Sequence, residues 1–161
     1  MNNIELSATL LDELRTRHLT LSSAESCTGG NIAHCLTAVP GASDVFNGAV
    51  VAYSNDVKHQ LLNVSLTTLE HFGAVSTQTV SEMLTGVAQA LNTDCAVATS
   101  GIAGPGGGTP TKPVGTVCIG AKLLGHQMVD TFHFQGSRTE VIEQSTRQAL
   151  IMMADLLAKH N

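Results

Sequence analysis

Three short stretches of the chain combine small residues with groups that could act as a nucleophile or a base. The stretch "SSAESCTGG" over residues 22–30 contains Ser26 and Cys27, and "AYSNDVK" over 52–58 contains Tyr53 and Lys58. The third, "TSGIAGPGGGTPTKPVG" over 99–115, has five glycines between positions 101 and 108. A hydroxyl or thiol attacks a carbonyl carbon when a nearby base takes its proton. These residue types indicate a small-ligand domain with a nucleophile, provided that the fold brings the stretches together.

The first stretch lies between an apolar run and a helical pattern. Thr28, Gly29 and Gly30 are predicted to form the first helical turn, where backbone N–H groups lack a partner within the helix. Such groups stabilise an anion or a developing oxyanion. The alternative is structural: Ser26 or Thr28 only caps the helix, and the glycines only allow close packing.

The second stretch carries the only tyrosine of the chain, Tyr53, and Lys58 five residues later. A lysine at the carboxyl end of a buried strand is partly desolvated, which lowers its pKa and lets it accept a proton from a hydroxyl. A lysine on the surface and a tyrosine at the edge of the core are the alternatives.

The third stretch has so little side chain that its backbone amides could approach a ligand closely. It matches neither GxxxxGK[ST] nor GxGxxG, so it carries no fingerprint of a nucleoside triphosphate or a dinucleotide. A flexible connector is the alternative.

Cysteine and histidine spacing gives little support for other chemistries. Cys27 is a rival nucleophile, because a helix N-terminus beside it is expected to lower the pKa of its thiol. The four cysteines match no zinc pattern and no CxxC pair, so most are expected to be small buried thiols. The seven histidines include no HxH or HExxH, and we expect neither a metal nor a cofactor.

The apolar periodicity predicts strands that alternate with helices. Helices are predicted over 4–18, 28–39, 55–62, 65–72, between Ser76 and Asn92, and over 137–159 with a capping box at Ser137 and Glu140. Strands are predicted over 19–24, 45–54, 94–102, 114–124 and 127–134. This order predicts a mostly parallel sheet, mixed because of the late hairpin, with helices on both faces. Ligands bind at the carboxyl ends of such strands, where the three stretches lie.

Composition limits the class of protein. At 161 residues, with 43% hydrophobic and 13% charged residues, the chain is expected to form one α/β domain over 1–161. A net charge of −5 and scattered Lys and Arg predict no direct contact with nucleic acid. No apolar run approaches the ~18 residues that cross a bilayer, and the amino terminus has no signal-peptide pattern. We therefore expect no membrane association and a cytoplasmic location.

Five motifs, taken together, resemble the carboxy-terminal domain of the competence/damage-inducible protein CinA and the stand-alone nicotinamide mononucleotide amidohydrolases, PncC. They are "AESCTGG" at 24–30, "VVAYSNDVKHQLLNV" at 50–64, "GAVS…VSEML" at 73–84, "ATSGIAGPGGG…KPVGTV" at 98–117 and "FQGSR" at 134–138. The resemblance implies a three-layer α/β/α sandwich. It also implies hydrolysis of the carboxamide of nicotinamide mononucleotide to nicotinic acid mononucleotide and ammonia, a step of pyridine nucleotide salvage.

The resemblance also implies roles for individual residues. Ser26 matches the catalytic hydroxyl of the family, assisted by Tyr53 and Lys58. Lys58, directly or through Tyr53, would take the proton of Ser26, and amides near Thr28 to Gly30 would stabilise the oxyanion; attack by water, with Ser26 only positioning the amide, is the alternative. The substrate-binding residues expected are Glu25, Thr28, Gly29, Gly30, Asn55, Ser100, Gly101, Gly104, Gly106, Gly107, Lys112 and Arg138, with Lys112 and Arg138 as candidates for the phosphate.

Two other functions remain open from the sequence. One is a ligand-binding relative without catalysis, and the other is a module that interacts with a protein partner. Related proteins suggest a homo-oligomer. The amino-terminal nucleotide-hydrolysing domain of full-length CinA has no counterpart in these residues, so its pyrophosphatase activity is not expected.

Overall fold

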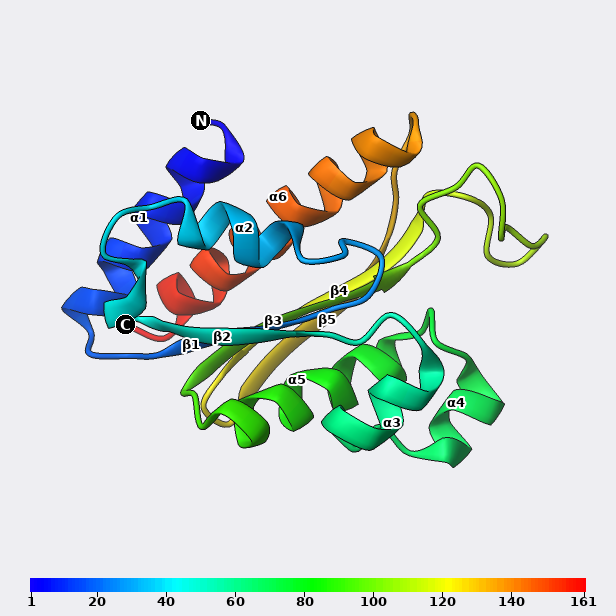
Figure 1. The fold of residues 1–161 in the computed structure, drawn as a ribbon, viewed down its shortest axis with the longest axis horizontal. Helices are drawn as coiled ribbons and strands as arrows, with labels where there is room; N and C mark the ends of the chain where they lie inside the picture. The colour runs from blue at the N-terminus through cyan, green and yellow to red at the C-terminus, as the bar shows by residue number, and fades with distance from the viewer.

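The computed structural model describes residues 1–161 and contains one five-stranded sheet (Figure 1). The strands are β1 (Leu21–Glu25), β2 (Phe46–Val51), β3 (Cys95–Gly101), β4 (Thr116–Leu123) and β5 (His126–His133), in the order β2-β1-β3-β4-β5. β1 pairs in parallel with β2 and β3, whereas β4 pairs antiparallel with β3 and β5. Only β4 therefore runs against the other strands, and the predicted mixed sheet is confirmed.

Helices cover both faces of the sheet, which confirms the predicted three-layer α/β/α fold (Figure 1). One layer contains α1 (Asn3–Thr16), α2 (Asn31–Thr37) and α6 (Arg138–Lys159), and the other contains α3 (Asn55–Leu62), α4 (Leu66–Phe72) and α5 (Thr77–Leu91). A short 3₁₀ helix, η1 (Ala42–Asp44), leads into β2. No helix is both long and apolar enough to pass through a bilayer.

Two hydrophobic cores lie on either side of the sheet. Side chains of β3 alternate between them, because neighbouring residues of a strand point to opposite faces. Cys95 and Val97 pack toward α1, α2 and α6, while Ala96 and Ala98 pack toward α5. Burial on both faces explains why the strand reads as a continuous apolar run. The four cysteines are free and buried, as predicted.

The sequence signals for helix ends are confirmed for α5 and α6 and are wrong for the start of α2. Ser76 caps α5, Asn92 ends it in a left-handed conformation, and α6 starts with the predicted capping box of Ser137 and Glu140. The expected helical turn over Thr28 to Gly30 does not form. Gly29 and Gly30 have φ values of 59° and 99°, which an α-helix does not permit, so α2 begins only at Asn31.

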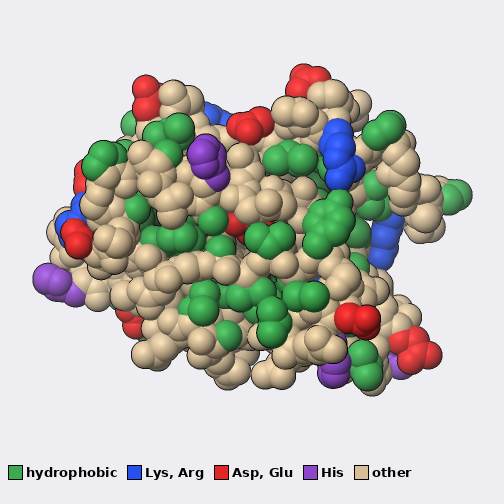
Figure 2. Space-filling view, in the orientation of Figure 1, with side chains coloured by type: hydrophobic (Ala, Val, Ile, Leu, Met, Phe, Trp, Pro, Cys, Tyr) green, Lys and Arg blue, Asp and Glu red, His purple; other side chains and the backbone are tan.

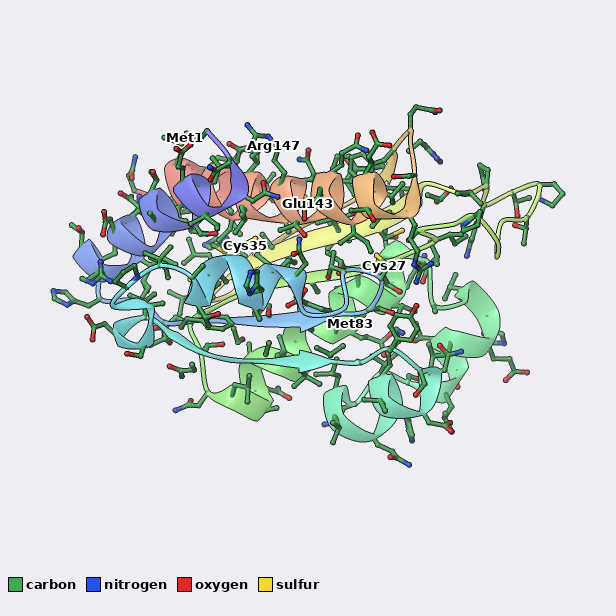
Figure 3. All side chains as sticks on the ribbon, turned by 45° about the horizontal axis from the view of Figure 1, so that its top comes forward. Met1, Cys27, Cys35, Met83, Glu143 and Arg147 are labelled. Atoms are coloured by element: carbon green, nitrogen blue, oxygen red, sulfur yellow. The ribbon has the colours of Figure 1, made fainter.

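The topology gathers distant segments at one edge of the sheet. β1, β2 and β3 end at this edge, and β4 begins there because it runs in the opposite direction. The three chemically suggestive stretches follow β1, β2 and β3. In Figure 3, Cys27 lies just beyond β1, at the end of the sheet away from Met1. The fold thus brings together what the sequence separates.

Packing of α5 against the end of α3 sets the position of the segment that carries Lys58. A Cβ atom at Gly86 of α5 would lie 1.9 Å from the carbonyl oxygen of Leu62, the last residue of α3. Gly86→Ala should therefore lower the free energy of unfolding, measured in urea, by about 1–3 kcal/mol through overpacking.

Gly125→Ala is the matched control, because nothing lies within 4 Å of a Cβ atom at that position. Its free energy of unfolding should stay within about 0.5 kcal/mol of the parent value. Equal stability of the two variants would contradict the close contact between α5 and α3.

Candidate active site

A pocket of about 280 Å³ opens at the edge of the sheet where the strand ends meet. It is bounded by the segments that follow β1, β2 and β3, the turn before α5, and the start of α6. Ten of the residues predicted from the sequence line it: Ser26, Tyr53, Asn55, Lys58, Ser100, Gly101, Gly104, Gly106, Gly107 and Arg138. Glu25, Thr28, Gly29, Gly30 and Lys112 are not among its lining residues.

Lys58 is the central group of the pocket, and it is only 1% exposed. Ser54 caps α3, so that Lys58 follows in the first turn with its side chain directed inward. Its Nζ lies 2.9 Å from Ser26 Oγ, 2.9 Å from the carbonyl oxygen of Ala52 and 3.4 Å from that of Tyr53. Burial lowers the pKa of this amine from its ordinary value of 10.5, as the sequence predicted.

These three partners suit both protonation states of the amine. A neutral amine has two N–H donors and one lone pair, so the two carbonyls accept its N–H groups and the lone pair is left for the hydroxyl of Ser26. After protonation, the third N–H donates to the same oxygen. Nζ can therefore take and return the Ser26 proton without losing a hydrogen bond.

The backbone of Ser26 is fixed on both sides. Its N–H donates to the carbonyl of Thr99 at the end of β3, and its carbonyl accepts from the N–H of Gly29. The side chain is 7% exposed and faces the pocket beside Lys58. A held nucleophile beside a base is the arrangement that nucleophilic catalysis requires.

Cys27 also lines the pocket, but its thiol is not activated. Burial raises the pKa of this thiol to about 11, and hydrogen bonds from the Thr99 side chain and the Cys27 backbone, together with the nearby charge of Lys58, offset only part of the rise. The expectation that a helix N-terminus lowers this pKa is wrong. α2 begins four residues later, at Asn31, and its first free N–H groups donate to Glu25 instead.

The side chain of Glu25 stabilises the turn between β1 and α2 and does not face the pocket. Its carboxylate is fully buried and accepts four hydrogen bonds, from Ser23 Oγ, Thr28 Oγ1 and the N–H groups of Ile32 and Ala33, at 2.7–3.1 Å. The carboxylate thus supplies the cap that Gly30 lacks. In the sequence, the signal for this role is the single carboxylate of Glu25 among small residues just before a predicted helix.

Arg138 joins three segments at the rim of the pocket. It donates to the carbonyl of Gly104 at 2.8 Å and to the hydroxyl of Tyr53 at 2.9 Å. The Tyr53 phenol therefore bonds to Arg138, while only the main-chain carbonyl of Tyr53 bonds to Lys58. Lys112 lies elsewhere: its Nζ donates to the carbonyl of Phe72, beside a separate hollow that contains His71 and His133.

The pocket is lined by basic residues, whereas the chain as a whole is acidic. Lys58 and Arg138 line it and no carboxylate does, although the chain carries a net charge of −5. On the face shown in Figure 2, Lys and Arg side chains lie apart and form no continuous stripe. No group of three or more His, Cys, Asp or Glu residues is placed to hold a metal ion. The pocket therefore favours a small ligand with a negative group.

Comparison with known proteins gives one consistent family. The profile of the CinA C-terminal domain matches residues 3–157. A CinA-like protein of Thermotoga neapolitana is 47% identical over 93% of the chain, and a putative competence-damage inducible protein of Clostridium beijerinckii is 45% identical over 99%. The chain spans 36% and 38% of the length of these two curated relatives.

Solved structures agree with the sequence relatives. The competence damage-inducible protein A of Klebsiella pneumoniae superposes with a TM-score of 0.96 at 35% identity, and all of both chains is covered. The competence/damage inducible protein CihA of Agrobacterium tumefaciens has a TM-score of 0.94 at 39% identity, with 98% of this chain and 97% of that chain covered.

The buried carboxylate of Glu25 generates a prediction about stability. Glu25→Gln places an amide NH₂ group where the carboxylate accepts from the N–H of Ile32 or Ala33. An unsatisfied buried donor costs about 1–3 kcal/mol, so the free energy of unfolding in urea should fall by that amount.

Glu70→Gln is the matched control, because Glu70 is exposed on α4 and makes no side-chain hydrogen bond. Its stability should change by less than about 0.5 kcal/mol. If both variants unfold at the same urea concentration, the carboxylate of Glu25 does not hold the turn.

Proposed function

This chain belongs to the CinA C-terminal domain family, and on that premise we propose that it hydrolyses the carboxamide of nicotinamide mononucleotide to nicotinic acid mononucleotide and ammonia. One observation carries the proposal: the Nζ of a buried lysine with a lowered pKa lies 2.9 Å from the hydroxyl of Ser26. No carboxylate bonds to this amine and holds it charged. A serine and a lysine in this state form a nucleophile and its base.

The reaction begins when Ser26 Oγ attacks the carboxamide carbon and its proton passes to Lys58 Nζ. The carbonyl oxygen becomes negative in the tetrahedral intermediate. Lys58 then gives the proton to the amide nitrogen, the C–N bond breaks and ammonia leaves. Water attacks the resulting ester with Lys58 again taking a proton, which returns to Ser26 Oγ as the carboxylic acid product departs and ionises in solvent.

The geometry supports direct proton transfer between Ser26 and Lys58. Their side chains bond to each other, whereas the hydroxyl of Tyr53 bonds to Arg138. Tyr53 is 60% exposed, so its phenol stands at the rim of the pocket, away from the buried amine. Tyr53 would then contribute its backbone carbonyl to Lys58 and its side chain to the rim.

Arg138 supports a substrate that carries a phosphate. Its two hydrogen bonds go to neutral oxygens, and no carboxylate pairs with its guanidinium group. A phosphate at the rim could therefore take a bidentate, charge-assisted contact with it. Asn55 and Ser100 also line the pocket and offer polar groups to the remainder of the substrate.

Ammonia release from nicotinamide mononucleotide tests the proposal. Ser26→Ala should lower kcat/KM by about 10³-fold or more, because it removes the nucleophile. Lys58→Arg should lower it by about 10²–10⁴-fold, since a guanidinium keeps its proton and cannot act as a base.

Cys27→Ala provides the control, because it changes the neighbouring residue and leaves the serine and lysine in place. Its kcat/KM should stay within a few-fold of the parent value. An inactive Cys27→Ala variant beside an active Ser26→Ala variant would reverse the assignment. Absence of ammonia from the parent protein would refute the proposed activity and leave a role in ligand binding.

A further inference from the structure

The direction of the backbone groups of β3 reveals an unused donor beside Ser26. The N–H of Cys95 donates to the carbonyl of Thr20, and the carbonyl of Thr99 accepts from Ser26. The backbone N–H and C=O groups of odd-numbered β3 residues therefore point toward β1. Those of even-numbered residues point toward β4, as the hydrogen bond from the N–H of Ile102 to the carbonyl of Thr116 shows. Because backbone groups alternate along a strand, the N–H of Gly101 faces the side of β1.

The N–H of Gly101 has no acceptor in the protein. β1 ends at Glu25, and the carbonyl of Ser26, which would be the next acceptor for β3 on this side, accepts from the N–H of Gly29 instead. Gly101 lines the same pocket as Ser26. A side chain cannot occupy this place, because a Cβ atom at Gly101 would lie 2.7 Å from the Cα of Val117.

The residue after the nucleophile carries a second free donor. Cys27 follows Ser26, lines the pocket and is only 6% exposed, yet its N–H donates to no other residue. Buried N–H groups without a partner are rare in folded proteins, so the one at Cys27 calls for an explanation. Gly101 is half-buried and carries the second free N–H, and both residues line one pocket next to one serine.

We infer that the backbone N–H groups of Cys27 and Gly101 together bind the oxyanion that forms when Ser26 attacks the carboxamide. This inference rests on the proposed function. It places the donors elsewhere than the sequence did, because Gly29 already uses its N–H and none of Thr28, Gly29 and Gly30 lines the pocket. It also gives Cys27 a role through its backbone while its thiol stays protonated.

Replacement of single amides by esters tests the inference without changing a side chain. Cell-free translation with tRNA carrying a hydroxy acid would produce Gly101→glycolic acid, which is compared with the parent protein. The same method would produce Cys27→lactic acid, which is compared with Cys27→Ala because both carry a methyl side chain. In each pair, the N–H alone becomes an oxygen atom.

Each ester should lower kcat by about 10²–10³-fold relative to its partner, with KM changed by only a few-fold, because the N–H acts in the transition state. Unfolding in urea should change little, since neither N–H donates to another residue. Gly125→glycolic acid is the control: its N–H also has no acceptor, but it lies in the turn between β4 and β5, at the opposite end of the sheet. Its kcat should equal that of the parent.

A boronic acid separates the inference from the proposed function. Pyridine-3-boronic acid should form a tetrahedral adduct with Ser26, visible by ¹¹B NMR, with one boron oxygen in place of the oxyanion. Its affinity should fall at least tenfold in each ester variant. If ammonia is released and the esters keep full kcat, the inference fails and the activity stands. If no ammonia is released, an affinity that falls as expected supports the inference, and an unchanged affinity or an absent adduct overturns it.

Discussion

The contact between Lys58 Nζ and Ser26 Oγ is the interaction on which the site depends. A buried ammonium loses its hydration and is costly, so burial lowers the pKa of the enclosed amine. A carboxylate partner would oppose this shift by holding the proton. The pocket contains no such partner, and the two main-chain carbonyls beside Nζ accept hydrogen bonds in either protonation state. The basicity of Lys58 therefore depends on the two carbonyls beside the amine and on the lack of a carboxylate in the pocket.

The fold separates the acid of this region from its base. Glu25 is the last residue of β1. Its carboxylate accepts four hydrogen bonds, which stabilise the turn before α2. Ser26, the next residue, faces the other way, toward Lys58. Parallel pairing of β1 with both β2 and β3 makes this meeting possible, because all three strands end at one edge. The positive rim at Arg138 comes from the start of α6.

Residue types and periodicity predicted most of the architecture, since burial on both faces of β3 and the cap at Ser76 leave local marks in the sequence. They also identified the stretches that line the pocket. Long-range contacts could not be predicted in the same way. Burial decides the pKa of the Cys27 thiol, and the approach of the loop to Phe72 decides where Lys112 lies. Likewise, the free N–H of Gly101 is visible only once the register of β1 and β3 is known.

Titration of Lys58 shows whether burial makes this amine a base for Ser26. In protein labelled with ¹³C at the lysine ε-carbon, the Lys58 signal is identified by its loss in Lys58→Arg, and its shift is followed against pH. We predict a pKa below 10.5, because desolvation disfavours the ammonium. A pKa at or above 10.5 would show an amine that stays charged at neutral pH, and would contradict its role as the base for Ser26.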